Sequence, residues 1–164
     1  DHGDLDKEYR RQRQMCIRVS LDVIQRASRL FDRVVVAVAR NNNKTPLFSP
    51  DERKELIKES VSELANVDVD VFEGLLIDYV TKQNCNIVIR GIRAVSDFEF
   101  EFQMALMNRK LNEKIETLFM MPRASYSFLS SHLVKEIASL GGDVSTFVSA
   151  TTSKALVTKL SKKS

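Results

Sequence analysis

The sequence predicts an α/β fold in which parallel strands alternate with helices. Three observations lead to this prediction. Short apolar runs of strand length recur along the chain, amphipathic segments with helical spacing separate them, and polar loops follow several of the runs. Repeated strand–helix units favour a doubly wound, Rossmann-like parallel sheet with right-handed crossovers, in a single domain. In such a sheet, ligands bind beyond the carboxyl ends of the strands.

Five segments have the composition of strands. The clearest is VVVAVA, which lies between Arg33 and Arg40. A continuous apolar run bounded by charge is typical of a strand that is covered on both faces of a parallel sheet. We therefore expect a five-stranded parallel sheet, with strands over residues 16–20, 34–39, 67–72, 86–90 and 115–121.

Helix signals lie between these runs. Ser49 is suited to an N-cap, Pro50 to the first turn, and Glu52 completes a capping box. The stretch from Ser96 to Glu99 repeats the capping-box pattern. We expect helices over residues 21–31, from residue 50 onward, and over residues 75–83, 96–111, 131–140 and 153–161.

The length and composition indicate one soluble globular domain. A chain of 164 residues can bury a full core, and 43% hydrophobic with 29% charged residues is ordinary for such a domain. We expect residues 1–14 to be an extension and residues 15–164 to form the domain, because Met15 is suited to a natural start. The net charge of +3 gives little electrostatic support for a nucleic-acid partner.

The sequence also lacks signals for a membrane or a secreted protein. No apolar run approaches the roughly 20 residues that span a bilayer, and the highly charged first residues are unlike a signal peptide. Cys16 and Cys85 lie in apolar runs, where reduced thiols are expected. These features favour a cytoplasmic protein. With two histidines and two scattered cysteines, an all-protein zinc site is not expected, and neither glycine-rich phosphate motif is present.

The most informative stretch is Arg90-Gly91-Ile92-Arg93, which ends the fourth expected strand. Arginine at the carboxyl end of a strand is well placed to bind an anion. Gly91 would let a ligand approach the backbone, and two guanidinium groups can hold phosphate oxygens. The alternative is that both arginines pair with Asp97 or with nearby glutamates.

Two other polar loops follow strands in the same way. The loop over residues 41–46 carries Lys44, which is either a phosphate contact or a solvated lysine. The segment YSFLSSH, residues 126–132, offers hydroxyls and helix-start amides to a phosphate, although a serine there also serves as a simple N-cap. His132 is expected at the surface. The convergence of three loops at strand ends favours a phosphate-rich small-molecule site.

Side chains on the helix near residue 100 raise two further questions. Glu99 and Glu101 are two positions apart, so they point to different sides of a helix and form no acid–base dyad. Glu101 alone remains a candidate that faces the strand ends. Phe98, Phe100 and Phe102 are expected to be core or subunit contacts.

Three segments in this order resemble bacterial phosphopantetheine adenylyltransferases, which are nucleotidyltransferases of coenzyme A biosynthesis. They are LDVIQRASRLFDRVVVAVARNNNKTPLFSPDERKELI, IRGIRAVSDFEFEFQMALMNRKL and SFLSSHLVKEIASLGGDV. The resemblance implies the doubly wound fold and transfer of the adenylyl group of ATP to 4′-phosphopantetheine, which gives dephospho-CoA and pyrophosphate. It also implies Mg²⁺ as cofactor and a homo-oligomer, usually a hexamer.

The resemblance also implies roles for individual residues. Lys44 matches the lysine that meets the phosphates and the pantetheine substrate, Leu76 a pantetheine contact, and Arg90 the arginine that holds the substrate phosphate. Lys44 and Arg93 would be catalytic. The residues matching the ATP site are Gly91, Ile92, Arg93, Glu101, Tyr126, Ser127, Phe128, Leu129, Ser130, Ser131 and His132.

The sequence departs from this family at one place. The family carries a G-[TS]-F-D-P-x-T-x-G-H segment between its first strand and first helix, with a hydroxyl residue for the substrate and a histidine for the transferring phosphate. Here Ser20 is followed directly by Leu21. A strand-to-helix connection usually takes about 2 to 6 residues. We therefore expect a spatial gap between Ser20 and Leu21, left by an omitted loop. If instead the peptide is continuous, the first strand or the first helical turn must unravel, and the chain becomes a candidate for binding without catalysis.

Overall fold

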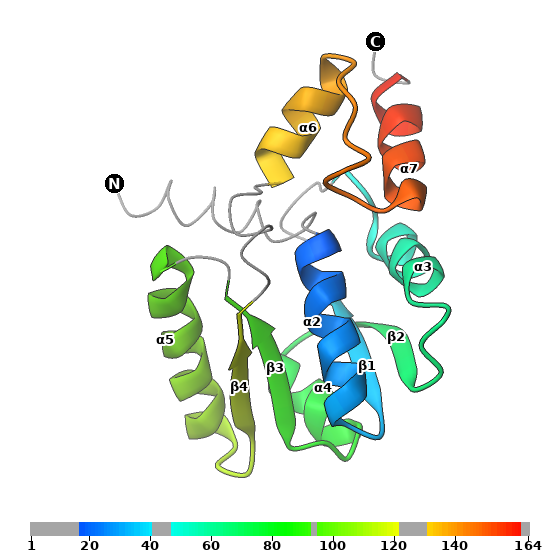
Figure 1. Ribbon diagram of the computed structural model, residues 1–164. Coiled ribbons are helices and arrows are strands. Elements are labelled where there is room, and N and C mark those ends of the chain that lie inside the picture. The colour runs from blue at the N-terminus through cyan, green and yellow to red at the C-terminus, as the bar shows by residue number, and fades with distance from the viewer. Residues whose placement is uncertain (1–16, 41–46, 93–94, 122–130, 162–164) are drawn as a thin grey trace.

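The computed structural model describes residues 17–40, 47–92, 95–121 and 131–161 (Figure 1). Within these ranges, strands and helices alternate along the chain, as the sequence predicts. The strands are β1 (Val34–Ala39), β2 (Val67–Phe72), β3 (Ile87–Gly91) and β4 (Glu116–Met120). The helices are α2 (Ile17–Leu30), α3 (Pro50–Ser60), α4 (Leu76–Lys82), α5 (Val95–Leu111), α6 (Ser131–Ser139) and α7 (Ala150–Ser161). No described helix is long and apolar enough to cross a membrane.

The described strands form two parallel pairs and not one sheet of five strands. β1 pairs with β2, from Val34 opposite Val67 to Ala39 opposite Phe72. β3 pairs with β4 in the same direction. Each pair is joined by a helical crossover, which is the unit expected of an α/β fold. The α/β class with parallel strands is confirmed, whereas the single five-stranded sheet is not observed.

The predicted first strand, residues 16–20, is wrong for the part that the structure describes. Residues 17–20 form the first turn of α2, which continues without interruption through Ser20 and Leu21. The expected gap at this join is therefore absent. A strand needs connecting residues to turn back over its sheet edge, and none are present here. The chain instead extends the helix towards its N-terminus, and α2 lies between the two strand pairs, against β1 and β3 (Figure 1).

Helix boundaries follow their capping signals closely. At α3 the predicted capping box is present: the Glu52 amide donates to Ser49 Oγ at 3.1 Å, and the Ser49 amide donates to Glu52 Oε2 at 2.8 Å. α5 begins one residue earlier than expected, so Ser96 lies in its first turn rather than before it. α7 begins at Ala150 because Ser149 caps it, accepting from the Thr152 amide at 3.3 Å.

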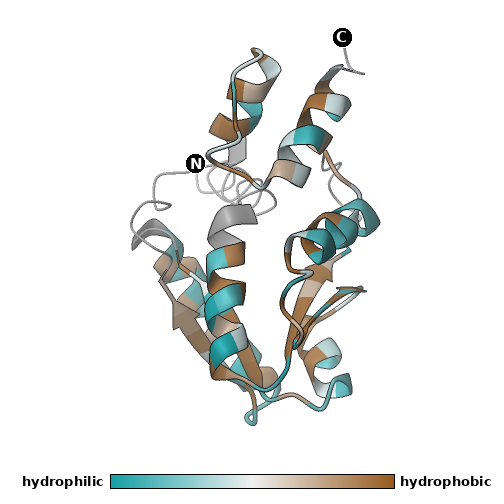
Figure 2. Ribbon diagram, turned by 45° about the vertical axis from the view of Figure 1, so that its right-hand side comes forward, coloured by the Kyte–Doolittle hydropathy of each residue, from teal (hydrophilic) through white to brown (hydrophobic). Residues whose placement is uncertain are grey.

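Two hydrophobic clusters hold these elements together. The first packs α3, α6 and α7 on one another beyond the strand ends. The second lies between α4 and the β3–β4 pair. In Figure 2 the strands are mostly hydrophobic brown, whereas the outer helix faces carry hydrophilic teal. The buried members are Phe48, Val134, Val144, Val148 and Leu156 in the first cluster, and Ile77, Val80, Val88 and Ile115 in the second.

Candidate functional site

Arg90 forms a two-pronged ion pair with Glu101 at the carboxyl end of β3. Arg90 Nε lies 3.1 Å from Glu101 Oε2, and Nη2 lies 3.2 Å from Oε1. The Glu101 side chain is only 2% exposed, whereas that of Arg90 is 35% exposed. The buried carboxylate on α5 therefore fixes the plane of a partly exposed guanidinium group at the strand end. Pairing with a nearby glutamate, the alternative left open by the sequence, is thus observed for Arg90.

Gly91 and Ile92 continue this strand end. A Cβ atom at Gly91 would lie 3.3 Å from Val23 Cγ2, so the close approach that this glycine allows in the structure is to helix α2. The Ile92 amide donates to the Met120 carbonyl at 3.0 Å, and its side chain is buried. The turn is therefore held tightly between α2 and β4, and it presents Arg90 from a rigid base.

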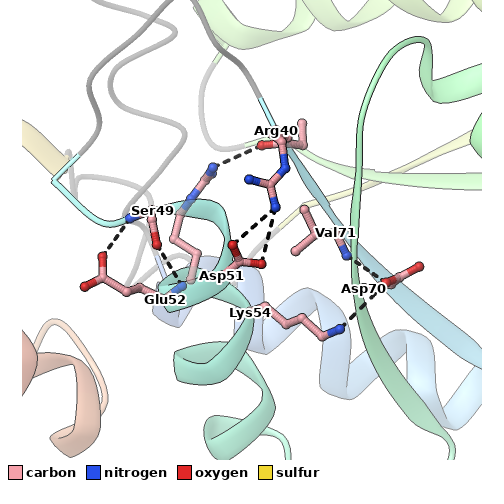
Figure 3. Close-up of polar contacts among 9 residues, drawn as sticks. Arg40, Ser49, Asp51, Glu52, Lys54, Asp70 and Val71 are labelled. Atoms are coloured by element: carbon pink, nitrogen blue, oxygen red, sulfur yellow. Dashed lines mark hydrogen bonds and ion pairs between the residues drawn. The ribbon is translucent and has the colours of Figure 1, made fainter.

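The carboxyl end of β1 is held by the first turns of α3 (Figure 3). Arg40, the residue after β1, places Nη2 3.2 and 3.3 Å from the two carboxylate oxygens of Asp51. Arg53 Nη2 donates to the carbonyl of Ala39 at 3.0 Å. Lys54 Nζ lies 3.7 Å from Asp70 Oδ1 on β2. Two basic side chains, those of Arg40 and Arg53, thus lie where the chain leaves β1, and Lys54 lies beside β2.

The N-terminal end of α3 is also tied to α7. Lys159 Nζ lies 2.7 Å from Glu52 Oε1. The hydrogen bond from Lys159, together with the Ser49 amide, lowers the pKa of Glu52 below its usual value. The capping glutamate therefore stays ionised at neutral pH and serves two partners. α7 in this way stabilises the start of the helix that holds the β1 end.

Leu76 is the first residue of α4, which follows the carboxyl end of β2. It is half-buried and packs against the cluster between α4 and the β3–β4 pair, while its neighbour Leu75 is 57% exposed. Because β1 and β2 are parallel, Leu76 lies at the same edge as the end of β1. The Leu76 side chain is therefore partly taken up by the core, and the exposed apolar side chain at this position is that of Leu75.

Several predicted site residues lie outside the described residues: Lys44, Arg93, Tyr126, Ser127, Phe128, Leu129 and Ser130. Ser131 and His132 begin helix α6, but the structure describes only their backbone. The roles of these residues remain predictions. Among the described residues, no group of three or more His, Cys, Asp or Glu side chains could hold a metal ion.

Two polar residues, Asp22 and Arg53, were not predicted from the sequence, and the burial of Asp97 was not predicted either. Both aspartates are 5% exposed, and Asp22 lies 3.5 Å from Arg26 on the next turn of α2. A carboxylate within an apolar helix face is a signal for a buried, paired side chain, because charged groups are seldom buried unless paired. Arg53 carries no such signal, because its position relative to β1 depends on how α3 packs.

Comparison with known proteins identifies the family of this chain. Residues 20–137 match the cytidylyltransferase-like family. The chain is 55% identical to the phosphopantetheine adenylyltransferase of Syntrophotalea carbinolica over 139 residues, which cover 85% of this chain and 84% of that protein. The chain belongs to the phosphopantetheine adenylyltransferase family.

Other members of the family show the same extent of similarity. The enzyme of Heliobacterium modesticaldum is 53% identical over 78% of this chain and 76% of its own length. That of Geotalea daltonii is 51% identical over 87% of this chain and 88% of its own length. The family resemblance stated from three sequence segments is therefore confirmed over most of the chain.

Proposed function

We propose that this chain transfers the adenylyl group of ATP to 4′-phosphopantetheine, giving dephospho-CoA and pyrophosphate in coenzyme A biosynthesis. The observation that carries the proposal is 51–55% identity to phosphopantetheine adenylyltransferases over most of the chain. The ion-paired Arg90 at the end of β3 supports it, because a fixed guanidinium group suits a phosphate ligand. Both family membership and geometry favour phosphoryl chemistry at the strand ends.

The reaction needs alignment and charge stabilisation rather than a covalent enzyme intermediate. A phosphate oxygen of phosphopantetheine attacks the α-phosphorus of ATP, the bond from that phosphorus to the bridging oxygen breaks, and pyrophosphate leaves with the bond electrons. In our proposal Arg90 holds the acceptor phosphate, and Leu76 contacts the pantetheine arm. Lys44 and Arg93 balance the charge that develops during transfer.

The ATP side of the site is assigned by the same proposal. The Gly91–Arg93 turn, Glu101 and the segment from Tyr126 to His132 would surround the nucleotide. We propose that ATP enters as its Mg²⁺ complex, because Mg²⁺ is commonly held by substrate phosphates with few protein carboxylates. A cytoplasmic location and partners limited to ATP, phosphopantetheine and further copies of the chain complete the proposal, without nucleic acid or membrane.

We further propose that the chain forms a homo-oligomer, with the hexamer of the resembling family as its expected form. Helix α5 supports this proposal, because it exposes apolar side chains that a monomer would leave in water. The adjoining strand β4 and the residue after it add two more. The exposed apolar residues are Phe98, Phe102, Met104, Leu106, Met107 and Leu111 on α5, and Leu118 and Met121 beside it.

A second function, nucleotide or coenzyme A binding without turnover, is favoured by one specific observation. α2 runs through Ser20 and Leu21, so no residues are present at the place where the family has its substrate hydroxyl and its phosphate-stabilising histidine. Losing one preorganised donor to a transition state typically costs about 10²- to 10³-fold in rate. A chain that binds both substrates but turns over very slowly would fit this alternative.

Pyrophosphate release and calorimetric binding separate the two functions. Catalysis predicts pyrophosphate release that requires both ATP and phosphopantetheine, whereas the alternative predicts binding without release. An insertion variant sharpens the test. A G-T-F-D-P-x-T-x-G-H segment inserted between Ser20 and Leu21 should raise turnover at least about 10²-fold, because it restores the phosphate-stabilising donor. The matched control is a Gly/Ser insertion of the same length. Equal rates for both insertions would contradict the proposed role of that segment.

A further inference from the structure

Arg53 connects helix α3 to the end of strand β1. Its Nη2 atom donates a 3.0 Å hydrogen bond to the carbonyl of Ala39, the last residue of β1. The amide of the next residue, Arg40, donates to the Phe72 carbonyl at 2.8 Å. Arg53 therefore contacts the main chain where it leaves the sheet, one peptide unit from the final bond to β2.

The arrangement of Arg53 is costly for stability. Its Nε atom is buried and has no hydrogen-bond partner. Burial also lowers the pKa of the guanidinium group below its usual value. A buried donor without a partner is destabilising, and an apolar side chain of similar length would avoid that cost. Fold stability by itself therefore does not account for an arginine at this position.

Neighbouring basic residues are satisfied differently. Arg40 pairs with Asp51, and Lys54 pairs with Asp70. Within the part of the chain that the structure describes, Arg53 has no carboxylate partner, and its one side-chain hydrogen bond is to the Ala39 carbonyl. Its charge is thus directed at the strand end itself and not at a surface carboxylate.

We propose that Arg53 is a positioning residue: from α3 it fixes the carboxyl end of β1, and with it the direction in which the chain enters the segment that carries Lys44. This inference rests on the proposed function, in which Lys44 acts on the substrate phosphates. Lys44 comes five residues after Ala39 in the sequence, so the strand end held by Arg53 is where the described chain leads towards it. Displacements of about 1 Å at a reacting centre can cost on the order of 10²-fold in rate.

The first test replaces Arg53 with residues that keep its bulk. Arg53→Met removes all the guanidinium donors and keeps an apolar stem, so the urea midpoint should stay near that of the wild type. We expect kcat to fall by about 10- to 100-fold with little change in KM for ATP. Arg53→Lys restores a donor near Ala39 and should recover a large part of the loss. Arg33→Met, which removes an exposed arginine from the same strand pair, is the matched control and should leave kcat unchanged.

A second readout does not depend on turnover. Without Arg53 the strand end loosens, so exchange of the Arg40 amide hydrogen should accelerate at least about 10-fold in Arg53→Met and stay unchanged in Arg33→Met. Unchanged exchange at Arg40 would overturn the inference whatever the rate of turnover.

In a Lys44→Ala background, Arg53→Met should cost no further activity. A full additional loss would also overturn the inference. If the wild type neither binds nor converts the substrates, the proposed function fails, and the exchange result still decides the structural role of Arg53.

Discussion

The ion pair between Arg90 and Glu101 allows a quantitative prediction about stability. Arg90→Ala would leave a carboxylate that is only 2% exposed without its two-pronged partner. Breaking a fully buried pair costs about 3 to 5 kcal/mol, because the remaining charge loses a partner that offsets it in a poorly solvated site. Since the Arg90 side chain is 35% exposed and water can partly replace it, we expect a loss of about 2 to 4 kcal/mol in the free energy of unfolding.

A second arginine provides a matched control for this variant. Arg33 Nε lies 3.0 Å from Asp68 Oδ2, nearly the same distance as in the Arg90 pair, but the two side chains are 62% and 60% exposed. Exposed pairs contribute about 0 to 1 kcal/mol, so Arg33→Ala should change stability little. Urea unfolding monitored by circular dichroism measures both variants. The two pairs match in charge and in their shortest distance, and they differ in burial and in the second hydrogen bond from Arg90 to Glu101.

Adding Glu101→Gln to Arg90→Ala tests the cause of the loss. A neutral amide removes the uncompensated charge, so the double variant should regain part of the lost stability. If Arg90→Ala costs no more than Arg33→Ala, or if Glu101→Gln deepens the loss, the buried charge is not the reason for it. Binding gives an independent result: Arg90→Ala should weaken phosphopantetheine binding more than ATP binding, and equal weakening would contradict its assignment to the acceptor phosphate.

Two further predictions concern pH and assembly. Burial and a hydrogen bond to Asp70 raise the pKa of Tyr79 from 10.0 to about 12, so the native state favours the protonated form. The contribution of Tyr79 to stability is therefore complete below pH 10 and is lost as the pH rises towards 12. Urea midpoints should show this loss in the wild type and not in Tyr79→Phe. The second prediction concerns Met107 on α5, which is 56% exposed. Met107→Glu should shift the mass measured by light scattering towards the monomer, whereas the control Glu99→Gln should leave that mass unchanged. An oligomer that survives Met107→Glu would place the interface elsewhere.

Strands and helices with strong local signals could be predicted from the sequence. β1 was recognisable as an apolar run between arginines, and α3 by the capping box at Ser49 and Glu52, because both depend on neighbouring residues. The candidate site was predicted in the same way, from Arg90 at a strand end. The sequence left Asp97 and the nearby glutamates as possible ion-pair partners of Arg90, and the structure pairs it with Glu101.

Features that depend on packing could not be predicted. The approach of Gly91 to a ligand stays a prediction, whereas its close approach to Val23 of α2 was not predicted. The contact from Arg53 to Ala39 depends on how α3 lies against β1, which no local pattern specifies. The buried Asp22 shares a helix face with apolar residues and was not distinguished from a solvent-facing position. In each case the deciding neighbour is distant in the sequence.

The conformation of residues 17–20 shows how a connection can override a local preference. Their composition favours a strand, but a strand there would need a loop before Leu21, and the chain has none. Once these residues join α2, no described strand lies between β1 and β3, and α2 contacts both strand pairs. Val23 contacts Gly91 on one side, and Asn66 Nδ2, just before β2, donates to the Phe31 carbonyl after α2 at 2.9 Å on the other.

The distance between the two halves of the site therefore depends on this helix together with α4. Arg90 belongs to the β3–β4 pair, and the strand end held by Arg53 belongs to the β1–β2 pair. Ladder hydrogen bonds fix the position of strands within each pair, whereas side chains of α2 and α4 link one pair to the other. Tyr79 of α4 donates to Asp70 on β2 at 3.0 Å, and α4 packs on the β3–β4 pair. Side-chain packing tolerates small shifts more readily than a continuous ladder does.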